Sequence, residues 1–322
     1  MAAGKAKASV VGIAAALVAG CAYGIGGTVS QIVKSQGFDL NHIVVGQFLA
    51  ATLVMGALVL IKYRPHMRVL DAIKLMLVGA MSVSSSYFYY YAIDLMTVGS
   101  AVAIQFQYVW IVVLISSIVD RKKPSVWVVL SAVMIIAGSI LASGVADEML
   151  GGGLVLDPVG LIYAAACAVV YGLFIFLNGK VVTDQPPVTR TFFMVLAGLI
   201  MASAIAPDFY IGACDVVSLI PGGVAMGLVM SVLPCVCLAI SAVRLPGGIV
   251  AILTSAELPM AVVSGAVILG ESVTPLVALG VVVILLAIVL SELPSLKTER
   301  SIDESPASCR GEEFDHCDAE SL

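Results

Sequence analysis

Ten long apolar segments constrain the fold of this chain more than any other feature. A helix needs about 20 apolar residues to cross the ~30 Å hydrocarbon core of a bilayer. The segments that approach this length are 9–31, 42–61, 75–93, 99–119, 126–143, 159–179, 191–207, 223–243, 248–269 and 275–291. Of the 16 basic and 21 acidic residues in the chain, only Glu257 falls inside them. The sequence therefore predicts an all-α membrane protein with ten transmembrane helices.

The composition supports the same conclusion. Hydrophobic residues make up 61% of the chain and charged residues only 11%, against roughly 45–50% and ~25% in soluble domains. This excludes an ordinary cytosolic enzyme, a disordered protein and a nucleic-acid binder with a basic face. Four cysteines lie in apolar spans, where they act as small hydrophobic side chains, and those of the tail lack a zinc spacing. We expect no metal and no cofactor.

Basic residues set the expected orientation. With the N-terminus inside, twelve basic residues of the membrane body fall in cytoplasmic segments and only Lys34 falls outside. This bias follows the positive-inside rule and predicts a multi-pass protein of the cell membrane with both termini cytoplasmic. The start of the chain, from Lys5 to Cys21, imitates a lipoprotein signal. However, the apolar run continues to about Val33, which is too long for a signal peptide.

The C-terminal segment 295–322 differs from the rest of the chain. It is polar, holds three basic and eight acidic residues, and so accounts for the whole net charge of −5. Such a segment cannot bury a core, and we expect an acidic, disordered cytoplasmic tail. A tether for a partner protein is the alternative.

The membrane body contains one pattern twice, which divides it into a first five-helix repeat at 9–143 and a second at 159–291. Tyr23-Gly24 corresponds to Tyr171-Gly172 at an offset of 148 residues. Because five spans per half is an odd number, the second repeat is inverted relative to the first. Inverted repeats place a substrate site near the bilayer midplane and support alternating access by rocking of one bundle against the other.

The second repeat carries the motifs of a known family. Ala256–Pro259 (AELP), Leu269–Glu271 (LGE), Pro275 and Gly280 resemble the second half of EamA-type permeases of the drug/metabolite transporter superfamily. The first half resembles the family more loosely, through Ser100–Gln107, Asp120-Arg121, Pro124 and Gly138. Three departures are Tyr108 at the place of the first-half proline, Asp120 in place of glutamate, and Gln47 where many members carry arginine.

The resemblance implies a secondary transporter of small organic metabolites that works by alternating access. Amino-acid-like solutes are the favoured substrates, and a multidrug or lipophilic-cation exporter is the alternative. The chain has no P-loop pattern, so a gradient of ions or solutes is the expected energy source. Two other classes remain to be distinguished: an intramembrane enzyme, which needs paired reactive groups at depth, and a structural or accessory membrane protein. The expected partners are a small-molecule solute, protons and membrane lipids, and no nucleic acid.

A polar stripe on the ninth span supplies the first candidates for the substrate path. Thr254, Glu257 and Ser264 share one face of a continuous helix by their spacing. They line a pore or allow tight helix packing. Pro259 interrupts the backbone hydrogen bonding of the same span and is a hinge candidate.

The fourth span supplies four further path candidates. Ser100 and Gln107 lie seven residues apart on one face, where a glutamine can bind a solute or join helices. Tyr108 and Trp110 lie too deep for an interfacial belt and are candidates for contacts with an apolar solute, with core packing as the alternative. The aromatic run Tyr87–Tyr91 fits an interfacial belt, with one or two of its rings left as candidates for the rim of an outer vestibule.

Glu257 is the strongest functional candidate. A charge at the bilayer centre costs at least ~2.5–3.5 kcal/mol, and no lysine or arginine lies in any predicted span. Because desolvation disfavours the charged form of a carboxyl group, the side chain is expected to be protonated at rest or to face water. A proton-coupled carrier needs such a group. The alternative is a packing residue that the helix tolerates.

Overall fold

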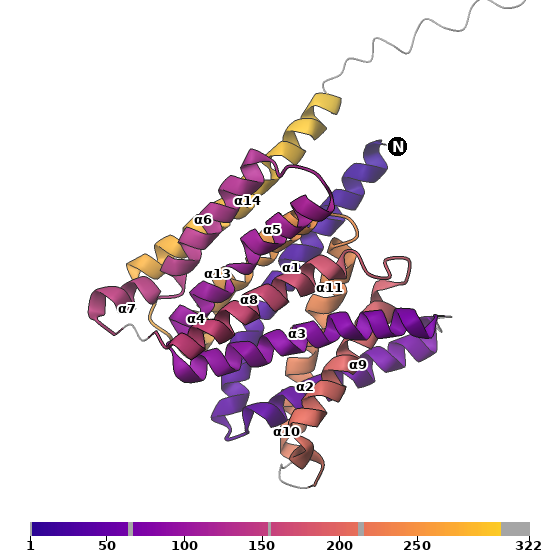
Figure 1. The fold of residues 1–322 in the computed structure, drawn as a ribbon, viewed down its shortest axis with the longest axis vertical. Coiled ribbons are helices and arrows are strands. Elements are labelled where there is room, and N and C mark those ends of the chain that lie inside the picture. Colours follow the sequence, from indigo (N-terminus) through magenta and orange to yellow (C-terminus); the bar gives the residue numbers. More distant parts are fainter. Residues whose placement is uncertain (1, 64–66, 154–155, 212–215, 304–322) are drawn as a thin grey trace, which may run out of the picture.

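The computed structural model describes residues 2–63, 67–153, 156–211 and 216–303, and these residues form helices joined by short turns, without a strand (Figure 1). The first half contains α1 (Ala2–Ser35), α2 (Leu40–Leu58) with its π-helical extension η1 (Val59–Tyr63), α3 (Val69–Leu95), α4 (Val98–Gln105), α5 (Tyr108–Val119), α6 (Val126–Ala142) and α7 (Val145–Gly151). The second half contains α8 (Pro158–Asn178), α9 (Pro187–Ile205), η2 (Pro207–Ile211), α10 (Val216–Met226), η3 (Gly227–Val232), α11 (Leu233–Ser241), α12 (Gly247–Thr254), α13 (Glu257–Ser264), η4 (Gly265–Leu269) and α14 (Pro275–Asp303).

Ten membrane spans can be formed from these helices. Within the described residues, nine helices or joined helices are long and apolar enough to cross a bilayer. The tenth is α6 together with α7, which are bent by 50° relative to each other. The prediction of an all-α, ten-span membrane protein is therefore confirmed.

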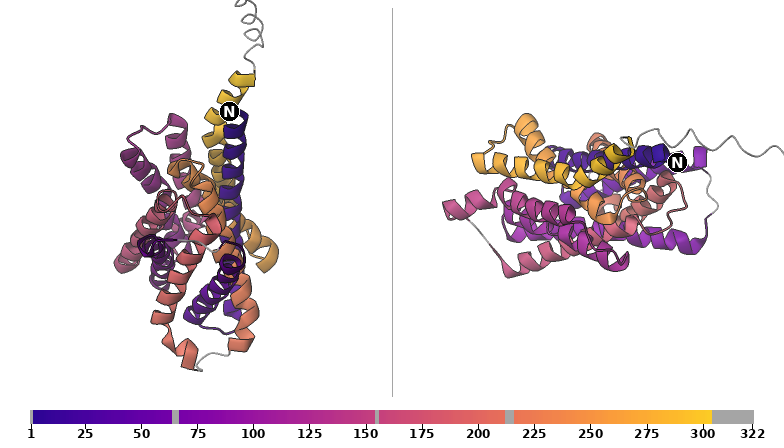
Figure 2. Two further views of the ribbon diagram at one scale, coloured as in Figure 1. Left: turned by 90° about the vertical axis from the view of Figure 1, so that its right-hand side faces the viewer. Right: turned by 90° about the horizontal axis from the view of Figure 1, so that it is seen from above.

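The two halves pack in equivalent ways. Helix α8 of the second half lies against α3, α4 and α5 of the first half, and α1 of the first half lies against α11, α12 and α13 of the second half. The pairs α2/α9 and α6/α14 join corresponding helices of the two repeats, and Figure 1 shows α6 running along α14. The start of α1 and the end of α14 lie at the same end of the molecule (Figure 2), as an even number of spans requires.

Small residues allow the closest of these approaches. A Cβ atom on Gly20 would lie 2.6 Å from the carbonyl oxygen of Thr254, and one on Gly24 would lie 2.4 Å from that of Glu257. A Cβ atom on Gly227 would lie 2.7 Å from the carbonyl oxygen of Gln47. The GxxxG spacings of this chain therefore serve contacts inside the protomer, where small residues let helix backbones meet.

The fourth and ninth spans are both broken, and at equivalent positions. The first break lies at Phe106–Gln107 between α4 and α5, and the second at Ser255–Ala256 between α12 and α13. Pro259 accounts for the second, because its ring and missing N–H disturb the carbonyl group four residues earlier, that of Ser255. The first break has no proline. The break therefore precedes Pro259, and Pro259 itself lies within the first turn of α13.

The breaks also correct which residues of the two halves correspond to each other. Tyr108 and Glu257 each begin the helix after a break, at an offset of 149 residues. Trp110, and not Tyr108, therefore corresponds to Pro259. The acids that end these spans, Asp120 and Glu271, lie 151 residues apart. The second half thus holds two additional residues, in a stretch that includes the π-helical turn η4, whose wider turn takes up extra residues.

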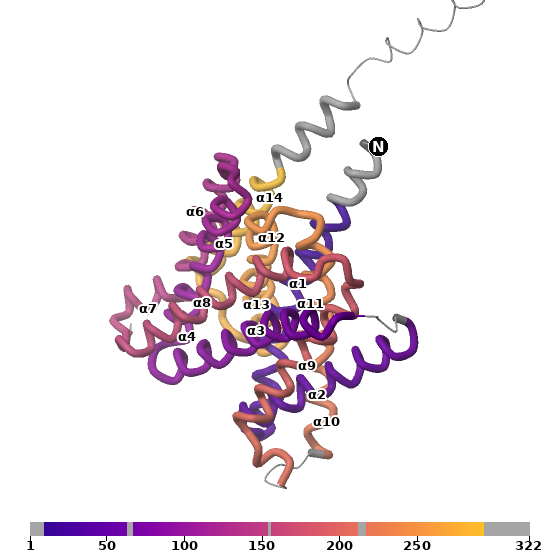
Figure 3. The backbone as a smooth tube through the Cα atoms, turned by 45° about the vertical axis from the view of Figure 1, so that its right-hand side comes forward, coloured from indigo at the N-terminus to yellow at the C-terminus, as the bar shows by residue number. Residues whose placement is uncertain are grey.

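The broken spans meet at one end of the molecule and not at the other. Helix α5 packs along α12, whereas α4 and α13 do not form a comparable packed pair. Figure 3 shows α5 beside α12 and α4 well separated from α13. We call these the packed end and the separated end.

Two regions differ from the sequence prediction. Arg190, expected in a cytoplasmic loop, lies within α9 and is fully buried. Its guanidinium group donates to the carbonyl oxygen of Ala239 at 3.3 Å and to both oxygens of Asn178. It thereby binds the C-terminal ends of α8 and α11, where helix dipoles favour a cation. In the predicted tail, α14 continues to Asp303, and 304–322 lie outside the described residues.

Candidate substrate site

Glu257 occupies the centre of the molecule, at the first residue of α13 and directly after the helix break. Its side chain is partly exposed, and its nearest hydrogen-bond donor is the hydroxyl group of Tyr171, 3.5 Å from Oε2. Among the described residues, no lysine, arginine or histidine forms an ion pair with it. The carboxyl group therefore faces an aromatic environment and not a basic one.

Three tyrosine rings from three different helices form this environment, and we call Tyr23, Tyr108 and Tyr171 the tyrosine cluster. The ring of Tyr171 (α8) contacts that of Tyr108 (α5) edge to face, with 4.8 Å between centroids. The ring of Tyr23 (α1) lies 6.3 Å from that of Tyr171 in a similar orientation. Such edge-to-face pairs are favourable aromatic contacts.

The hydroxyl groups fix the rings in place. That of Tyr108 lies 3.4 Å from both the carbonyl oxygen of Ala251 and Oγ1 of Thr254. That of Tyr23 lies 3.9 Å from Sγ of Cys235. The cluster is therefore anchored to α11 and α12, on two sides of Glu257.

Further titratable groups face the same carboxyl group from neighbouring helices. Glu257 interacts electrostatically with the hydroxyl groups of all three cluster tyrosines, with Tyr89 of α3, and with the thiol of Cys167 on α8. All of these partners are neutral acids in their ordinary protonation state. They can donate a hydrogen bond or present a ring face, but they cannot neutralise a carboxylate.

The inverted repeats explain why these groups converge. Tyr23 and Tyr171 are equivalent, as are Tyr108 and Glu257. Gly24 brings α1 against the backbone of Glu257, and Gly172 brings α8 to within 3.5 Å, measured from a Cβ built on it, of the carbonyl oxygen of Tyr108. Each tyrosine-glycine pair thus packs on the break of the opposite repeat.

The structure brings three of the predicted path residues together and separates the others. Glu257, Thr254 and Tyr108 share the centre. Ser264 is buried and hydrogen-bonds Oγ1 of Thr28 at 2.7 Å, in the contact between α13 and α1. The break at Ser255–Ala256 ends the continuous helical face on which the stripe was predicted.

The remaining candidates lie along the fourth span. Ser100 is buried in the first turn of α4 and accepts a hydrogen bond from Thr97 at 2.8 Å. Gln107 accepts a hydrogen bond from the indole nitrogen of Trp110 at 3.1 Å, and the Trp110 side chain is exposed on the outside of the helix. None of the hydrogen bonds of Ser100, Gln107 and Trp110 that the structure shows reaches Glu257.

Sequence reasoning missed Tyr23 and Tyr171 as site residues, although their repeat was recognised. The available signal was the offset itself, because equivalent residues of inverted repeats meet near the pseudo-twofold axis. Tyr89 was assigned to an interfacial belt with its neighbours. Its electrostatic interaction with Glu257 distinguishes it from them, and that interaction depends on how α3 packs.

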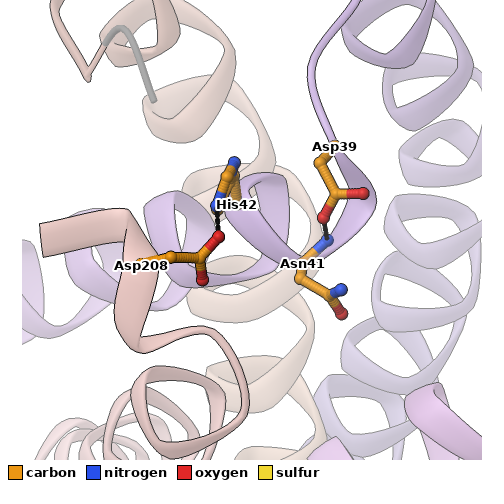
Figure 4. Close-up of polar contacts among 4 residues, drawn as sticks. All are labelled: Asp39, Asn41, His42 and Asp208. Atoms are coloured by element: carbon orange, nitrogen blue, oxygen red, sulfur yellow. Dashed lines mark hydrogen bonds and ion pairs between the residues drawn. The ribbon is translucent and has the colours of Figure 1, made fainter. Parts of the chain in front are cut away.

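Polar contacts hold the ends of the spans. At the packed end, Nζ of Lys180 lies 2.5 Å from Oδ1 of Asp120, beside a cavity of about 210 Å³ that Arg244 also lines. At the separated end, Nε2 of His42 lies 3.0 Å from Oδ2 of Asp208, and Asp39 accepts from the backbone N–H of Asn41 to begin α2 (Figure 4). Asp120, at the C-terminal end of α5, thereby joins this helix to the segment that follows α8.

Comparison with known proteins identifies the family. The family model described as "EamA-like transporter family" matches residues 10–144 and again residues 158–293. The chain belongs to the EamA-like transporter family. It is a multi-pass membrane transporter and not an enzyme.

Individual relatives are more distant. The chain is 28% identical over 243 residues to the threonine/homoserine exporter RhtA of Escherichia coli strain K12, covering 73% of this chain and 78% of RhtA. It is 28% identical over 245 residues to the RhtA of Salmonella typhimurium strain LT2, with 74% and 78% covered. A solved crystal structure shares the fold with a TM-score of 0.73 and 17% identity, over 91% of this chain and 99% of that one.

Proposed function

We propose that this EamA-family transporter exports small amino-acid-like solutes across the cell membrane by alternating access. The observation that carries the proposal is the lone carboxyl group of Glu257 among the rings of Tyr23, Tyr108 and Tyr171, at the meeting point of two inverted repeats. Inverted-repeat transporters bind substrate at this place. The RhtA relatives, named as threonine/homoserine exporters, support the substrate class.

The predicted orientation assigns a state to the structure. Lys180, Arg121 and Arg244 lie near the packed end, and the positive-inside rule places such residues in the cytoplasm. The packed end is then the closed cytoplasmic side, and the separated end faces outward. Export requires the reverse opening, in which α5 leaves α12 while α4 approaches α13.

Proton exchange at Glu257 supplies the energy in this proposal. A carboxyl group without a basic partner gains a proton readily in the membrane interior and must lose it when a cationic substrate group arrives. The groups facing it are Tyr23, Tyr108 and Tyr171, together with Tyr89 and Cys167. Tyrosine hydroxyl and cysteine thiol groups ordinarily keep their protons below about pH 8, so the proposal assigns the pH dependence to Glu257.

Counterflow in liposomes tests the function. Purified full-length protein is reconstituted with unlabelled L-threonine inside, and uptake of labelled L-threonine is measured from pH 5.5 to 8.5. We expect counterflow, and for Glu257→Gln, at normal expression, we expect weaker counterflow that no longer depends on pH. Glu271→Gln is the matched control, because Glu271 lies at the end of the same span, and it should keep the wild-type profile.

The outcomes separate the alternatives. Counterflow of tetraphenylphosphonium without that of L-threonine would favour the lipophilic-cation exporter. An absence of flux with every solute would favour an accessory role. An unchanged pH profile in Glu257→Gln would refute proton exchange at this residue.

A further inference from the structure

We infer that Glu257 and the tyrosine cluster form a binding site for a primary ammonium group, and that this group, rather than a carboxylate, is what the transporter requires of its substrate. The inference rests on the proposed function and specifies its substrate class. It assigns the four side chains one common role.

The charge of the site selects for a cation. Glu257 is the only acidic residue at the centre of the described spans, and no basic residue of the described chain pairs with it. A buried carboxylate needs a hydrogen-bonded counter-charge to be stable. A substrate ammonium group supplies both the charge and the N–H donors, and it fits the partly exposed carboxyl group.

The aromatic rings favour the same group. Ammonium ions bind over the faces of tyrosine rings within about 6 Å of the centroid. The rings of Tyr23, Tyr108 and Tyr171 approach from α1, α5 and α8, and the Tyr171 hydroxyl reaches the carboxyl group itself. Because the Tyr23 and Tyr108 hydroxyl groups are held by Cys235, Thr254 and Ala251, two of the rings are fixed before the substrate binds.

The site offers little to a carboxylate. Arg190 is fully buried and bound to the ends of α8 and α11, and Lys180 is paired with Asp120 at the packed end. Among the described side chains around Glu257, the donors that remain are neutral hydroxyl and thiol groups, and Thr254 already donates to backbone carbonyl groups at 2.9 and 3.1 Å. An amine that lacks the carboxylate should therefore still bind, and an acid that lacks a free amine should not.

A competition series tests this inference on the full-length protein in liposomes. The competitors of labelled L-threonine are 1-amino-2-propanol, which lacks the carboxylate, and N-acetyl-L-threonine, which lacks the ammonium group. We expect the amine to compete within about tenfold of L-threonine. N-acetyl-L-threonine should bind about 10- to 100-fold more weakly, as expected for the loss of a charged hydrogen-bonded pair.

Two variants of one residue separate the ring from its hydroxyl group. Tyr23→Phe keeps the ring and should retain the preference for amines. Tyr23→Leu should weaken amine competition by about 2- to 30-fold, the range of a cation–π contact. Tyr91→Leu is the control, because Tyr91 is exposed on α3, and it should behave as wild type.

The results distinguish this inference from the proposed function. Equal competition by N-acetyl-L-threonine and L-threonine would overturn the ammonium site while leaving the exporter intact. If L-threonine is not transported, the thermal stability of the purified protein is measured with 1-amino-2-propanol. Stabilisation that Glu257→Gln abolishes would support the ammonium site although the exporter assignment had failed, and no stabilisation would refute the site.

Discussion

The packed end and the separated end of this transporter are made from equivalent segments of two repeats, yet they differ in contact. At the packed end Gly247 and Gly248 of α12 face Ser116 and Val113 of α5. At the separated end Gly99, the counterpart of Gly248, faces Ser143 and Glu148 beside α6 and α7. The same repeat therefore supports two packings, and the alternating access that we propose requires the two ends to exchange them.

The hydrogen bonds of the two ends are consistent with this exchange. Thr97 at the start of α4 donates to Glu148 at 2.6 Å, and Thr274 at the start of α14 donates to Asp147 at 2.5 Å. Helix α7 therefore binds the first turns of two spans at the separated end. At the packed end, the ion pair between Asp120 and Lys180 joins α5 to the end of α8. Each end is thus held by a few polar contacts over a small-residue interface.

A covalent crosslink across the packed end should have the largest effect on transport. A Cβ on Gly247 would lie 2.6 Å from Oγ of Ser116, so the double variant Ser116→Cys/Gly247→Cys should form a disulfide within the usual Cβ separation of about 3.5–4.5 Å. If α5 must leave α12 during transport, oxidation should abolish L-threonine counterflow and a reducing agent should restore it.

The control for this prediction comes from the separated end and from the natural cysteines. Val98→Cys/Val267→Cys, on α4 and η4, should not crosslink in the same treatment, and oxidised wild type should retain its activity. Full transport by the crosslinked Ser116→Cys/Gly247→Cys protein would show that the packed end does not open.

Substitution of two equivalent glycines should give the next largest effect, a difference in stability, because the surroundings of these glycines differ between the repeats. An alanine at position 24 would place Cβ 2.4 Å from the carbonyl oxygen of Glu257 and 2.8 Å from the backbone nitrogen of Ala261. Backbone atoms cannot move aside cheaply, and we expect Gly24→Ala to lower the free energy of unfolding by about 1–3 kcal/mol. At Gly172 the nearest atom, Cγ2 of Val112, lies at 3.3 Å, and Gly172→Ala should cost less than about 1 kcal/mol.

Thermal unfolding of the purified proteins in one detergent measures this difference. Gly27→Ala is the control within α1, since a Cβ there meets no atom within 4 Å. Equal destabilisation by Gly24→Ala and Gly172→Ala would contradict the asymmetry between the two repeats.

The sequence predicted the spans and their repetition because both depend on local composition. Ten apolar runs, the tyrosine-glycine repeat and the positions of Asp120 and Glu271 were all visible in the printed residues. The resemblance carried by Ala256–Pro259 and Leu269–Glu271 was equally local, and the family it indicated is the one the chain belongs to.

The candidate site was predicted only where a residue was unusual in itself. Glu257 was recognised because a charge in a span is rare, whereas Tyr23 and Tyr171 look ordinary in an apolar helix. The helix break at Phe106–Gln107 was not predicted, and the one at Ser255–Ala256 was expected only as an interruption of the backbone hydrogen bonding at Pro259. They remove the continuous face on which Ser100, Gln107 and Ser264 were chosen, so that these residues join other contacts. Long-range packing, and not local pattern, decides which polar side chains meet.

Loss of the ion pair at the packed end should have the smallest effect on stability. It should, however, change how readily water-soluble reagents reach that end. Nζ of Lys180 and Oδ1 of Asp120 are 2.5 Å apart, and the two side chains remain 44% and 31% exposed. Partly exposed pairs contribute about 0–1 kcal/mol, so Asp120→Asn should barely change the melting temperature.

If the pair holds the packed end closed, however, its loss should make a cysteine at position 116 react faster with a water-soluble maleimide. The rate is measured in the Ser116→Cys background with and without Asp120→Asn. Asp71→Asn, which breaks the exposed pair with Lys74 on α3, is the matched control. An unchanged labelling rate would show that the contacts between the helices, without the ion pair, keep the packed end closed.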